Sequence, residues 1–426
     1  MRGATVISPR PDIQGMSSRR LGVGFIGAGF IARFMASSWT GVRDADIAAV
    51  YSRNERGAAE LAAHVEGLGM PRPRAYTDLH EMLADRAVEA AWVMTPNYAR
   101  VEAVHAVAEE ARQGRTDLMG IACEKPLART LDEAEEAVRL LDGTGLLHGY
   151  LENQVFAPSV VKGRDAVWRH GARSAGRPYL ARAAEEHGGP HNAWFWDPRL
   201  SGGGVLLDMS CHSLEACRFL LADPGKPKEG LRPVSVQAQI ASLKWTREPY
   251  LTQLRERYGV DYRVAPAEDY ASVSVLYEDD DGQRVLSEAR TSWNYVGPGL
   301  RLSLEALGPE YSLSMNSLNQ ELSVFFSRKV RVPASEEFLE KQAAEQGLIP
   351  VVPDEAVAYG YQHENRHMVR CFLEGRMPEE NWGDGLLVTG LMMAAYKSAE
   401  EGRTIGYDPS SLRGFTPAVA RGAWVP

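Results

Sequence analysis

Residues 21–32 read LGVGFIGAGFIA, an apolar run followed at once by two closely spaced glycines. The run Leu21–Ile26 predicts a β-strand, and Phe30–Ser37 predicts the helix that follows it. Between a strand and a helix, Gly27 allows a tight turn, and Gly29 lets the backbone approach a pyrophosphate group. The stretch therefore predicts a strand–turn–helix unit that binds a dinucleotide.

The first helical residues complete this pattern. Ala32 is small enough to let the helix pack close to the strand. The backbone N–H groups at the start of the helix, around Phe30 and Ile31, have no partner inside the helix and can donate to phosphate oxygens. The alternative, an accidental glycine-rich turn, does not account for the alternation of strands and helices that follows.

That alternation fills the first third of the chain and is typical of a doubly wound parallel sheet. The predicted strands are Leu21–Ile26, Ile47–Tyr51, Ala90–Thr95, Leu118–Cys123 and Leu146–Leu151. The predicted helices are Phe30–Ser37, Asn54–Val65, Asp78–Ala84, Arg100–Ala111 and Asp132–Leu141. We therefore expect an α/β chain whose residues 21–150 form an N-terminal Rossmann domain, preceded by a disordered leader over residues 1–20.

After residue 151 the pattern changes. A predicted helix at Ser159–His170 and a loop rich in tryptophan and glycine precede segments of alternating hydrophobicity. The predicted strands are Val234–Ser242, Ala271–Tyr277, Val285–Ser292, Leu300–Ala306, Tyr311–Met315 and Glu321–Phe326. Polar insertions occupy residues 245–268 and 328–356, and the last predicted helices are Gln362–Glu374 and Asp384–Glu401. We expect residues 151–426 to form an α+β domain that binds the substrate and has a large, mainly antiparallel sheet.

The composition limits the classes of partner that the protein is expected to bind. Of the 426 residues, 44% are hydrophobic and 24% are charged, and Gly 40 and Pro 24 are spread along the chain, so we expect little disorder. Lys+Arg 47 against Asp+Glu 56 gives a net charge of −9, and the basic residues are scattered. This pattern argues against nucleic acid and against a membrane, and no apolar run reaches spanning length. A small molecule is the expected partner.

The cysteines and one pair of arginines indicate the cellular compartment in which the protein is expected. Four cysteines without CxxC spacing are too few to brace a chain of this length, which fits a reducing compartment. Arg19-Arg20 resembles a twin-arginine export signal, but cleavage of the apolar stretch behind it would remove the glycine turn. We therefore expect a cytoplasmic protein.

The end of the second strand bears on the choice of cofactor. An acidic side chain there binds the ribose 2′-OH of NAD, whereas a cation accepts the 2′-phosphate of NADP. Here Ser52 and Arg53 come first, and Arg56 follows shortly after. A hydroxyl and two guanidinium groups favour NADP. Glu55 is close enough to reach a ribose, which leaves NAD as the alternative.

Two further motifs carry reactive side chains. Glu124-Lys125-Pro126 ends the strand at 118–123, where ligands gather in doubly wound sheets, and a lysine there can stabilise a developing alkoxide. Gly202-Gly203-Gly204 then introduces a predicted helix on which Asp208 and His212 share one face.

The imidazole of His212 titrates near neutral pH and can exchange a proton with a hydroxyl, while Asp208 one turn away raises its basicity or fixes its orientation. A pairing that only stabilises the helix is the alternative. Cys211 next to His212 also raises a metal site, but no second cluster supplies the remaining ligands, and we predict none.

These motifs in this order resemble the Gfo/Idh/MocA family, named for glucose-fructose oxidoreductase and inositol dehydrogenase. The resemblance covers about residues 21–405 and includes Thr95-Pro96-Asn97 after the strand at 90–95. It implies a sugar or polyol dehydrogenase in which Lys125, Asp208 and His212 are catalytic. It also implies a homodimer or homotetramer formed through the second sheet.

Two stretches depart from the family pattern. The stretch after Asn97 reads Tyr98-Ala99-Arg100 where the family commonly has a histidine. The run 149–154 replaces the family's more usual polar-aromatic run after the last strand of the first domain.

The expected reaction is hydride transfer between a nicotinamide and a secondary hydroxyl of a sugar, sugar derivative or cyclitol. His212 takes the hydroxyl proton, Lys125 stabilises the alkoxide-like oxygen, and Asp208 orients the other two. Expected cofactor contacts are Gly27, Gly29, Phe30, Ile31, Ala32, Ser52, Arg53, Arg56, Thr95, Pro96, Asn97, Glu124 and Lys125. Expected substrate contacts are Tyr98, Tyr150, Asn153, Glu186, His187, His191, Trp194, Trp196, Arg199 and His212, although a tryptophan-rich loop is equally compatible with core.

Two other functions are compatible with the sequence. A tightly held cofactor could oxidise a ring carbon, allow elimination of a glycosidic substituent and return the hydride, which gives glycoside cleavage without net redox change. A cofactor-binding sensor or scaffold without turnover is the other reading. The presence of Lys125, Asp208 and His212 together argues against it.

Overall fold

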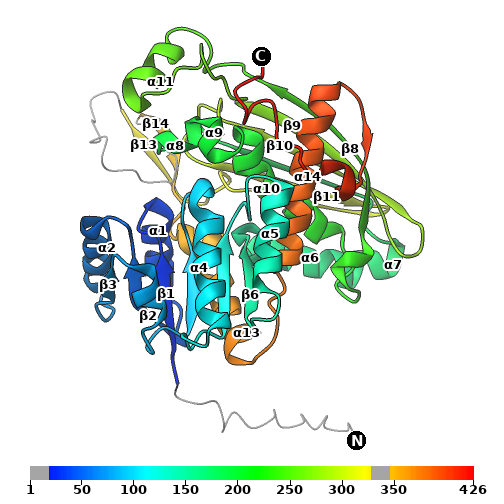
Figure 1. The fold of residues 1–426 in the computed structure, drawn as a ribbon. Coiled ribbons are helices and arrows are strands. Elements are labelled where there is room, and N and C mark those ends of the chain that lie inside the picture. The colour runs from blue at the N-terminus through cyan, green and yellow to red at the C-terminus, as the bar shows by residue number, and fades with distance from the viewer. Residues whose placement is uncertain (1–18, 328–345) are drawn as a thin grey trace, which may run out of the picture.

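The chain is described by a computed structural model that covers residues 19–327 and 346–426. Two large sheets organise these residues, with helices packed between and around them (Figure 1). Residues 1–18 of the predicted leader at 1–20, and residues 328–345 of the second insertion, lie outside the described ranges. The α/β class with a parallel N-terminal sheet and a mainly antiparallel C-terminal sheet is confirmed.

The first sheet is the predicted doubly wound sheet. Its six parallel strands are β1 (Leu21–Ile26), β2 (Ala45–Tyr51), β3 (Arg74–Tyr76), β4 (Ala90–Val93), β5 (Gly120–Glu124) and β6 (Leu147–Leu151), in the order β3-β2-β1-β4-β5-β6. Its helices are α1 (Phe30–Trp39), α2 (Glu55–Gly67), α3 (Leu79–Leu83), α4 (Arg100–Arg112) and α5 (Leu131–Leu141). The strand β3 lies outside every predicted range because its three residues contain no apolar run. The order reverses between β1 and β4, and ligands bind at such a switch point.

The second sheet has seven strands. These are β7 (Leu180–Glu186), β8 (Arg232–Ala241), β9 (Tyr270–Glu278), β10 (Arg284–Ser292), β11 (Arg301–Gly308), β12 (Tyr311–Asn316) and β15 (Ile405–Gly406), in the order β12-β11-β7-β10-β9-β8-β15. Only β7 and β10 pair in parallel. The predicted strand at Glu321–Phe326 belongs elsewhere, since β13 (Ser323–Phe326) pairs with β14 (Gly347–Pro350) in a separate ribbon.

The helices of the second half connect these layers. They are α6 (Pro158–Ala166), α7 (Arg173–Ala175), α8 (Ala193–Trp196), α9 (Pro198–Ser201), α10 (Val205–Leu221), α11 (Tyr250–Tyr258), α12 (Glu355–Ala358), α13 (Tyr361–Leu373) and α14 (Trp382–Glu401), and a π-helix spans Val167–Ala172. The predicted polar insertion at 245–268 contains α11 and packs against the core through Leu254, Tyr262 and Ala267.

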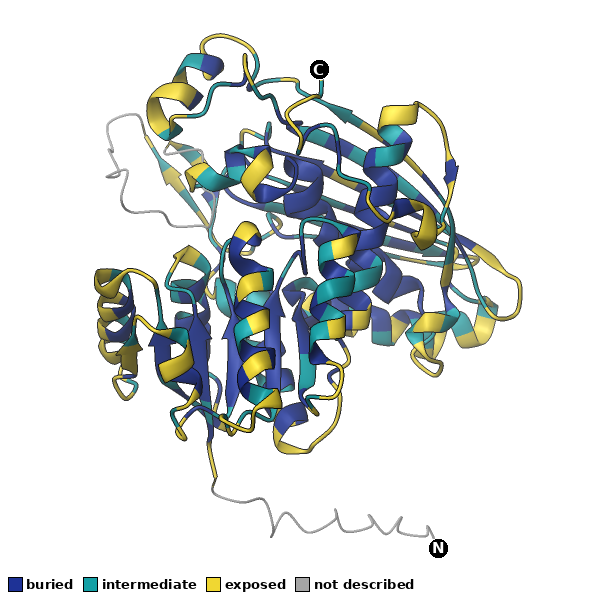
Figure 2. Cartoon of the chain, in the orientation of Figure 1, coloured by how far each residue is buried: buried dark blue, intermediate teal, exposed yellow. Residues whose placement is uncertain are grey.

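The helix α10 is buried along its whole length, as Figure 2 shows. It packs against β7 and β10 of the second sheet and against α14. Figure 1 shows it between the two sheets. This placement brings the carboxyl ends of the first sheet's strands close to the side chains that α10 carries.

The helix α13 returns to the first sheet although it follows the second in sequence. Asn365 accepts a hydrogen bond from the indole Nε1 of Trp92 on β4 at 2.9 Å. A side chain at Gly149 on β6 would collide with Met368, and one at Gly120 on β5 would collide with Phe372. The glycines therefore let α13 lie close against the sheet.

The helix α14 lies between the two halves. It contacts α5 of the first half, and it contacts α10 and β8 of the second. Its first turn carries Asp384, which forms a buried ion pair with Arg218 on α10. Arg218 also pairs with Glu215 at 2.7 Å, and Lys228 lies 2.6 Å from Glu380. Because these charges are removed from water, each depends on its partners.

Within the described residues, no helix combines the length and the apolar character needed to cross a membrane.

The buried ion network gives a test of the interface between α10 and α14. We expect Arg218→Met to lower the free energy of unfolding by about 3–5 kcal/mol, because it leaves buried carboxylates without their cation. Urea denaturation followed by fluorescence measures the change. The matched control is Arg232→Met, which removes an exposed pair with Asp280 and should have a several-fold smaller effect. Equal effects of the two substitutions would contradict this account.

Candidate active site

A cavity of about 510 Å³ lies at the carboxyl ends of β1, β2, β4 and β5 and is closed on the other side by residues of the second half. It brings together many predicted site residues from separate parts of the chain. These are Gly27, Gly29, Phe30, Ile31, Ser52, Arg53, Thr95, Pro96, Asn97, Glu124, Lys125, Asn153, His187, His191, Trp194, Asp208 and His212. The first-domain wall is defined as the lining residues up to Lys125, and the second-domain wall as those from Asn153 onward.

The glycine turn has the shape that a dinucleotide requires. Gly27 has φ +119, and a side chain there would lie 2.7 Å from the backbone oxygen of Met94. Gly29 is the N-cap residue of α1, and no side chain accepts a hydrogen bond from the first turn at this position. A Cβ atom added to Gly29 would meet no atom within 4 Å. The start of α1 thus offers unpaired N–H donors next to open space, which fits a pyrophosphate group. The residues present therefore fit a dinucleotide cofactor.

The end of β2 provides the predicted hydroxyl and one of the two predicted cations. Ser52 lines the cavity, and its hydroxyl oxygen accepts a hydrogen bond from the backbone N–H of Asn54. Arg53 is exposed, lines the cavity and has no side-chain partner among the described residues. Arg56 does not line the cavity, because its guanidinium group binds Glu60 at 2.7 Å. Ala32 also lies away from the cavity, buried in the core beneath α1, where it supports packing as predicted.

The loop after β4 is tied to both neighbours. The amide nitrogen of Asn97 donates to the backbone oxygen of Ser201, just before the three glycines, at 2.9 Å. Buried Arg100 donates to the backbone oxygens of Thr95 and Pro126. These bonds hold the loops after β4 and β5 in fixed positions beside α10.

Lys125 and Asp208 form a pair across the cavity. The Lys125 Nζ donates to the backbone oxygen of Asp208 at 2.8 Å and lies 3.5 Å from its Oδ1. Burial lowers the pKa of Lys125, but the carboxylate of Asp208 and other nearby acids outweigh it and raise the pKa above its ordinary value. The side chain is therefore an ammonium group at neutral pH.

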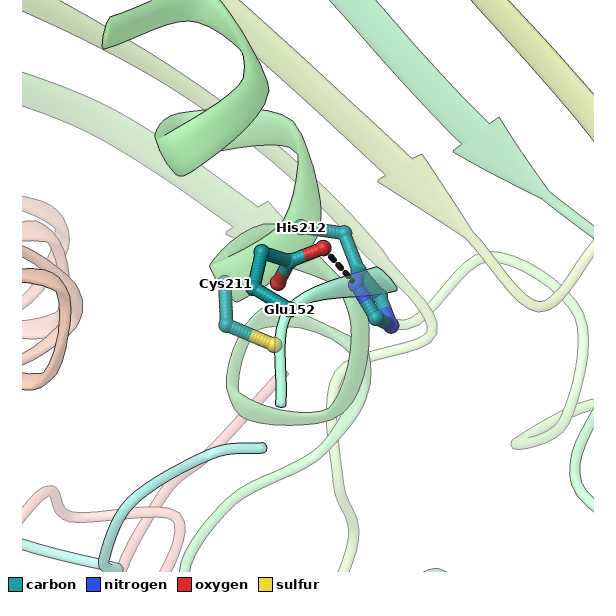
Figure 3. Close-up of side chains that lie close together, drawn as sticks. All are labelled: Glu152, Cys211 and His212. Carbon is teal, nitrogen blue, oxygen red and sulfur yellow. Dashed lines mark hydrogen bonds and ion pairs between the residues drawn. The ribbon is translucent and has the colours of Figure 1, made fainter. Parts of the chain in front are cut away.

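The partner of His212 differs from the prediction. Its Nδ1 lies 2.6 Å from Oε1 of Glu152, as the dashed line in Figure 3 shows, and Asp208 is occupied by Lys125. The prediction that Asp208 orients the imidazole is therefore corrected. Glu152 follows β6 directly, at the carboxyl end of a strand of the first sheet, and that position was the only signal in the sequence.

The Glu152–His212 pair is almost completely shielded from solvent. Glu152 is 0% exposed and His212 is 4% exposed. Burial raises the pKa of Glu152 to about 8, although the ammonium of Lys125 opposes the shift. Burial and the Lys125 charge lower the pKa of His212 to about 4. The imidazole is therefore neutral at neutral pH.

Cys211 lies beside this pair, and the three side chains gather as a metal site would (Figure 3). The 2.6 Å between Nδ1 and Oε1 is a hydrogen-bond distance, which leaves no space for an ion that needs about 2 Å to each ligand. Burial also raises the pKa of the Cys211 thiol well above its ordinary value, so it is not a thiolate. The geometry favours a hydrogen-bonded pair over a metal centre.

The start of α10 is held by a buried residue that the sequence analysis did not identify. Oε1 of Glu268 accepts hydrogen bonds from the backbone N–H groups of Gly204 and Leu206 and from the hydroxyl of Tyr396. Glu268 belongs to the predicted polar insertion, yet it is fully buried. It fixes the first turn of the helix that carries Asp208 and His212.

The second-domain wall contains further residues that the sequence analysis did not single out. Gln154 donates to Oε2 of Glu185 at 2.8 Å, and burial raises the pKa of Glu185. Other lining residues of this wall are Pro190, Asn192, Phe195, Met209, Leu300, Leu302, Tyr359 and Tyr361. Glu185 lies in β7, a strand outside the predicted ranges, which explains why it was missed.

Several predicted substrate contacts do not line the cavity. Trp196 is buried against Trp245 and Trp293 and forms core. Tyr150 is also fully buried. Arg199 pairs with Asp197 at the surface.

Tyr98 and Glu186 are the other two predicted contacts outside the cavity wall. The ring of Tyr98 lies edge-on to Trp194, with 6.4 Å between the ring centroids. Glu186 pairs with Arg301 on the neighbouring strand β11.

The sequence matches two models of one family. Residues 21–150 match the model described as "Oxidoreductase family, NAD-binding Rossmann fold", and residues 171–314 match the "GFO/IDH/MocA C-terminal domain". Together they cover the first sheet and most of the second sheet, whose strand β15 lies outside the matched ranges.

Curated relatives are reductases and dehydrogenases. A 1,5-anhydro-D-fructose reductase from Ensifer adhaerens is 30% identical over 47% of this chain and 56% of its own length. A D-xylose 1-dehydrogenase [NADP(+)] from Haloarcula marismortui is 26% identical over 45% of this chain and 49% of its own length. The chain thus spans about half the length of these relatives.

Among solved structures, GenD2 from gentamicin A biosynthesis in complex with NAD is similar over 95% of this chain and all of that chain, with 25% identity and a TM-score of 0.73.

The two glycines of the turn give a test of the cofactor cradle. We expect Gly29→Ala to raise the Kd for the dinucleotide at least about tenfold, because the added methyl group enters the open space at the start of α1. The unfolding temperature of the apoprotein should not change.

The matched variant is Gly27→Ala, whose positive φ and contact with Met94 should instead lower the unfolding temperature by several degrees. Calorimetry of binding and thermal unfolding measure the two effects. Normal dinucleotide affinity in Gly29→Ala would exclude the cradle.

Proposed function

The chain belongs to the Gfo/Idh/MocA family of oxidoreductases, and on this premise we propose that it transfers hydride between a nicotinamide cofactor and a secondary hydroxyl or ketone of a sugar, sugar derivative or cyclitol. One observation carries the proposal. The Lys125 ammonium and the neutral imidazole of His212 line the same cavity as the dinucleotide cradle. A charge that stabilises oxygen and a group that accepts a proton are what alcohol oxidation requires beside an acceptor for the hydride.

Each of the three side chains His212, Lys125 and Asp208 has a separate role in this reaction. The nicotinamide, when bound, supplies the hydride acceptor or donor. His212 accepts the hydroxyl proton at Nε2, the ring nitrogen opposite its bond to Glu152. Lys125 stabilises the negative charge that develops on the substrate oxygen. Asp208 holds the ammonium in place through its backbone oxygen and its carboxylate.

The second-domain wall favours an uncharged polyol. Among the described residues this wall contains no lysine or arginine, and its carboxyl groups are those of Glu185 and Asp208. Carboxylates and amides accept and donate hydrogen bonds to hydroxyl groups, while Trp194 and Phe195 offer apolar ring faces to C–H surfaces. A phosphate or carboxylate substituent would face acidic side chains here and would be repelled.

The cofactor is proposed to be NADP, with NAD as the alternative. The exposed and unpaired guanidinium of Arg53 and the hydroxyl of Ser52 line the cavity where the adenosine ribose binds in this fold. Glu55, the acid that could bind a ribose 2′-OH, is not among the lining residues. Both cofactors occur among similar proteins, since the xylose dehydrogenase is named for NADP and GenD2 was solved with NAD.

The second sheet offers a surface for assembly with further copies of the chain. The face of the second sheet turned away from α10 carries paired charges such as Arg182 with Glu288 and is half exposed. We propose that this face forms a homodimer or homotetramer contact.

The four cysteines are free and buried, which fits the reducing cytoplasm.

Arg53 gives a test of cofactor choice. We expect Arg53→Ala to raise the Kd of NADP⁺ about tenfold or more, because a charge-assisted bond to the 2′-phosphate is lost. The Kd of NAD⁺ should stay within about threefold. Fluorescence titration with both nucleotides measures the change. Arg56→Ala is the control, since Arg56 is held by Glu60 and should affect neither nucleotide. An equal loss for NAD⁺ and NADP⁺ would contradict the proposal.

The reaction is tested with the nucleotide that copurifies and a panel of substrates. We expect reduction of NADP⁺ with uncharged sugars or cyclitols and little or none with sugar phosphates or sugar acids. Lys125→Met and His212→Ala should each lower kcat by about 10²-fold or more while the nucleotide still binds. Absorbance of the reduced nicotinamide gives the rates. Turnover of a glycoside without a net absorbance change would instead support redox-neutral cleavage, and unchanged rates in both variants would exclude these roles.

A further inference from the structure

Glu152 is a fully buried carboxyl group that can hold a proton at neutral pH, and orientation of His212 alone does not require this property. We propose that Glu152 is the final acceptor of the substrate proton and that His212 relays this proton, so that the imidazole stays neutral throughout the reaction. The inference rests on the proposed function. Glu152 acts only through His212, which makes it a positioning residue that also stores a proton.

Among the described residues, the imidazole of His212 is the one side chain of the cavity wall that is hydrogen-bonded to Glu152. Its Oε1 lies 2.6 Å from Nδ1 of His212 and also accepts the backbone N–H of Gln154. Among the described residues its other oxygen, Oε2, is buried without a partner. Glu152 is 0% exposed and does not line the cavity, whereas His212 does. Within the described parts of the chain, the His212 ring is therefore the titratable group that links Glu152 to the cavity.

A second histidine–carboxylate pair in the same chain shows what is unusual here. His80 Nδ1 also lies 2.6 Å from Oε1 of a buried glutamate, Glu110. Glu110 is in addition bound by the guanidinium group of Arg115, at 2.7 Å and 2.5 Å. That bond is the main reason why the pKa of Glu110 falls to about 2, which keeps it ionised. Among the residues that the structure describes, no cation is bonded to Glu152, and its buried carboxyl can hold a proton at neutral pH.

The proton transfer balances without a new charge on the ring. As hydride leaves the carbon for the nicotinamide, the substrate O–H bond breaks and Nε2–H forms. In the same step the Nδ1–H bond of His212 breaks and an O–H bond forms on Oε1 of Glu152. The pair starts as carboxylate with neutral imidazole and ends as carboxylic acid with neutral imidazole in its other tautomer. After product release the proton returns through Nε2 to solvent.

The surrounding charges favour this route over formation of imidazolium. The Lys125 ammonium repels a second cation in the cavity, while Asp208 on α10 and Glu185 on β7 attract one. Glu152 faces Lys125 as well as the carboxyl groups of Glu124 and Glu364. Because the pair is almost completely buried, neutralising an existing carboxylate costs less than creating an ion on the ring.

Nitrogen NMR of ¹⁵N-histidine-labelled protein tests the relay without substrate or cofactor. Between about pH 5.5 and 9.5, His212 should change from the Nε2–H tautomer to the Nδ1–H tautomer with a midpoint near 8, and imidazolium should not appear. In Glu152→Gln this change should be absent. In Glu110→Gln, which alters the matched pair, it should be retained. A wild-type His212 that keeps one tautomer, or that becomes imidazolium above about pH 6, would overturn the proposal.

Kinetics give the second arm. Oxidation requires the ionised Glu152, so its rate should rise with pH through about 8, and the rate of reduction should fall over the same range. Glu152→Gln can still hold the ring but cannot accept a proton. Its kcat for oxidation should fall about 100-fold, while its KM should stay within about threefold. The acid limb of its pH–rate profile should move to lower pH by more than about one unit.

A purely structural role predicts a different result. In that case Glu152→Gln would keep the acid limb of the wild type, and its kcat would stay within about threefold. Glu152→Asp keeps a carboxylate and should retain the limb near pH 8 even if its rate falls, which covers the event that Glu152→Gln does not fold. Because the NMR arm uses the protein alone, a failure to find any dehydrogenase substrate would leave its result intact.

Discussion

A helix buried along its entire length must find a partner inside the protein for each polar group that it carries, and α10 is such a helix. At its start, Glu268 accepts the N–H groups of Gly204 and Leu206. In its first half, Lys125 pairs with Asp208 and Glu152 pairs with His212. Near its end, Arg218 pairs with Asp384 of α14. Four separate parts of the chain are therefore held to one helix by the requirement to satisfy buried polar groups.

This constraint also builds the candidate site. The lysine and the glutamate come from strand ends of the first sheet, while the aspartate and the histidine come from α10. Neither half contains the complete set, so the reactive groups meet only when the two sheets dock. The cavity between them receives the open start of α1 on one side and the aromatic and acidic side chains of the second-domain wall on the other.

The sequence predicts the local parts of this arrangement well. The turn at Gly27 and Gly29, the lysine after β5, and the shared helix face of Asp208 and His212 depend on short spacings that backbone geometry fixes. The bond between Glu152 and His212 joins residues sixty positions apart and depends on how the two halves dock, which periodicity does not encode. Strand β7 reads LARAAEE, a composition that favours a helix, and becomes a strand because β10 and β11 pair with it on both sides.

The return of α13 to the first sheet also sets an order of events during synthesis. The last strand of that sheet ends at Leu151, but the helix that covers Trp92, Gly120 and Gly149 is complete only at Leu373. At roughly 5–20 residues per second, the ribosome needs on the order of ten to forty seconds to make the chain between them. For that interval the nascent first sheet carries an uncovered apolar face, and the emerging protein depends on its own later residues, or on a chaperone, to shield it.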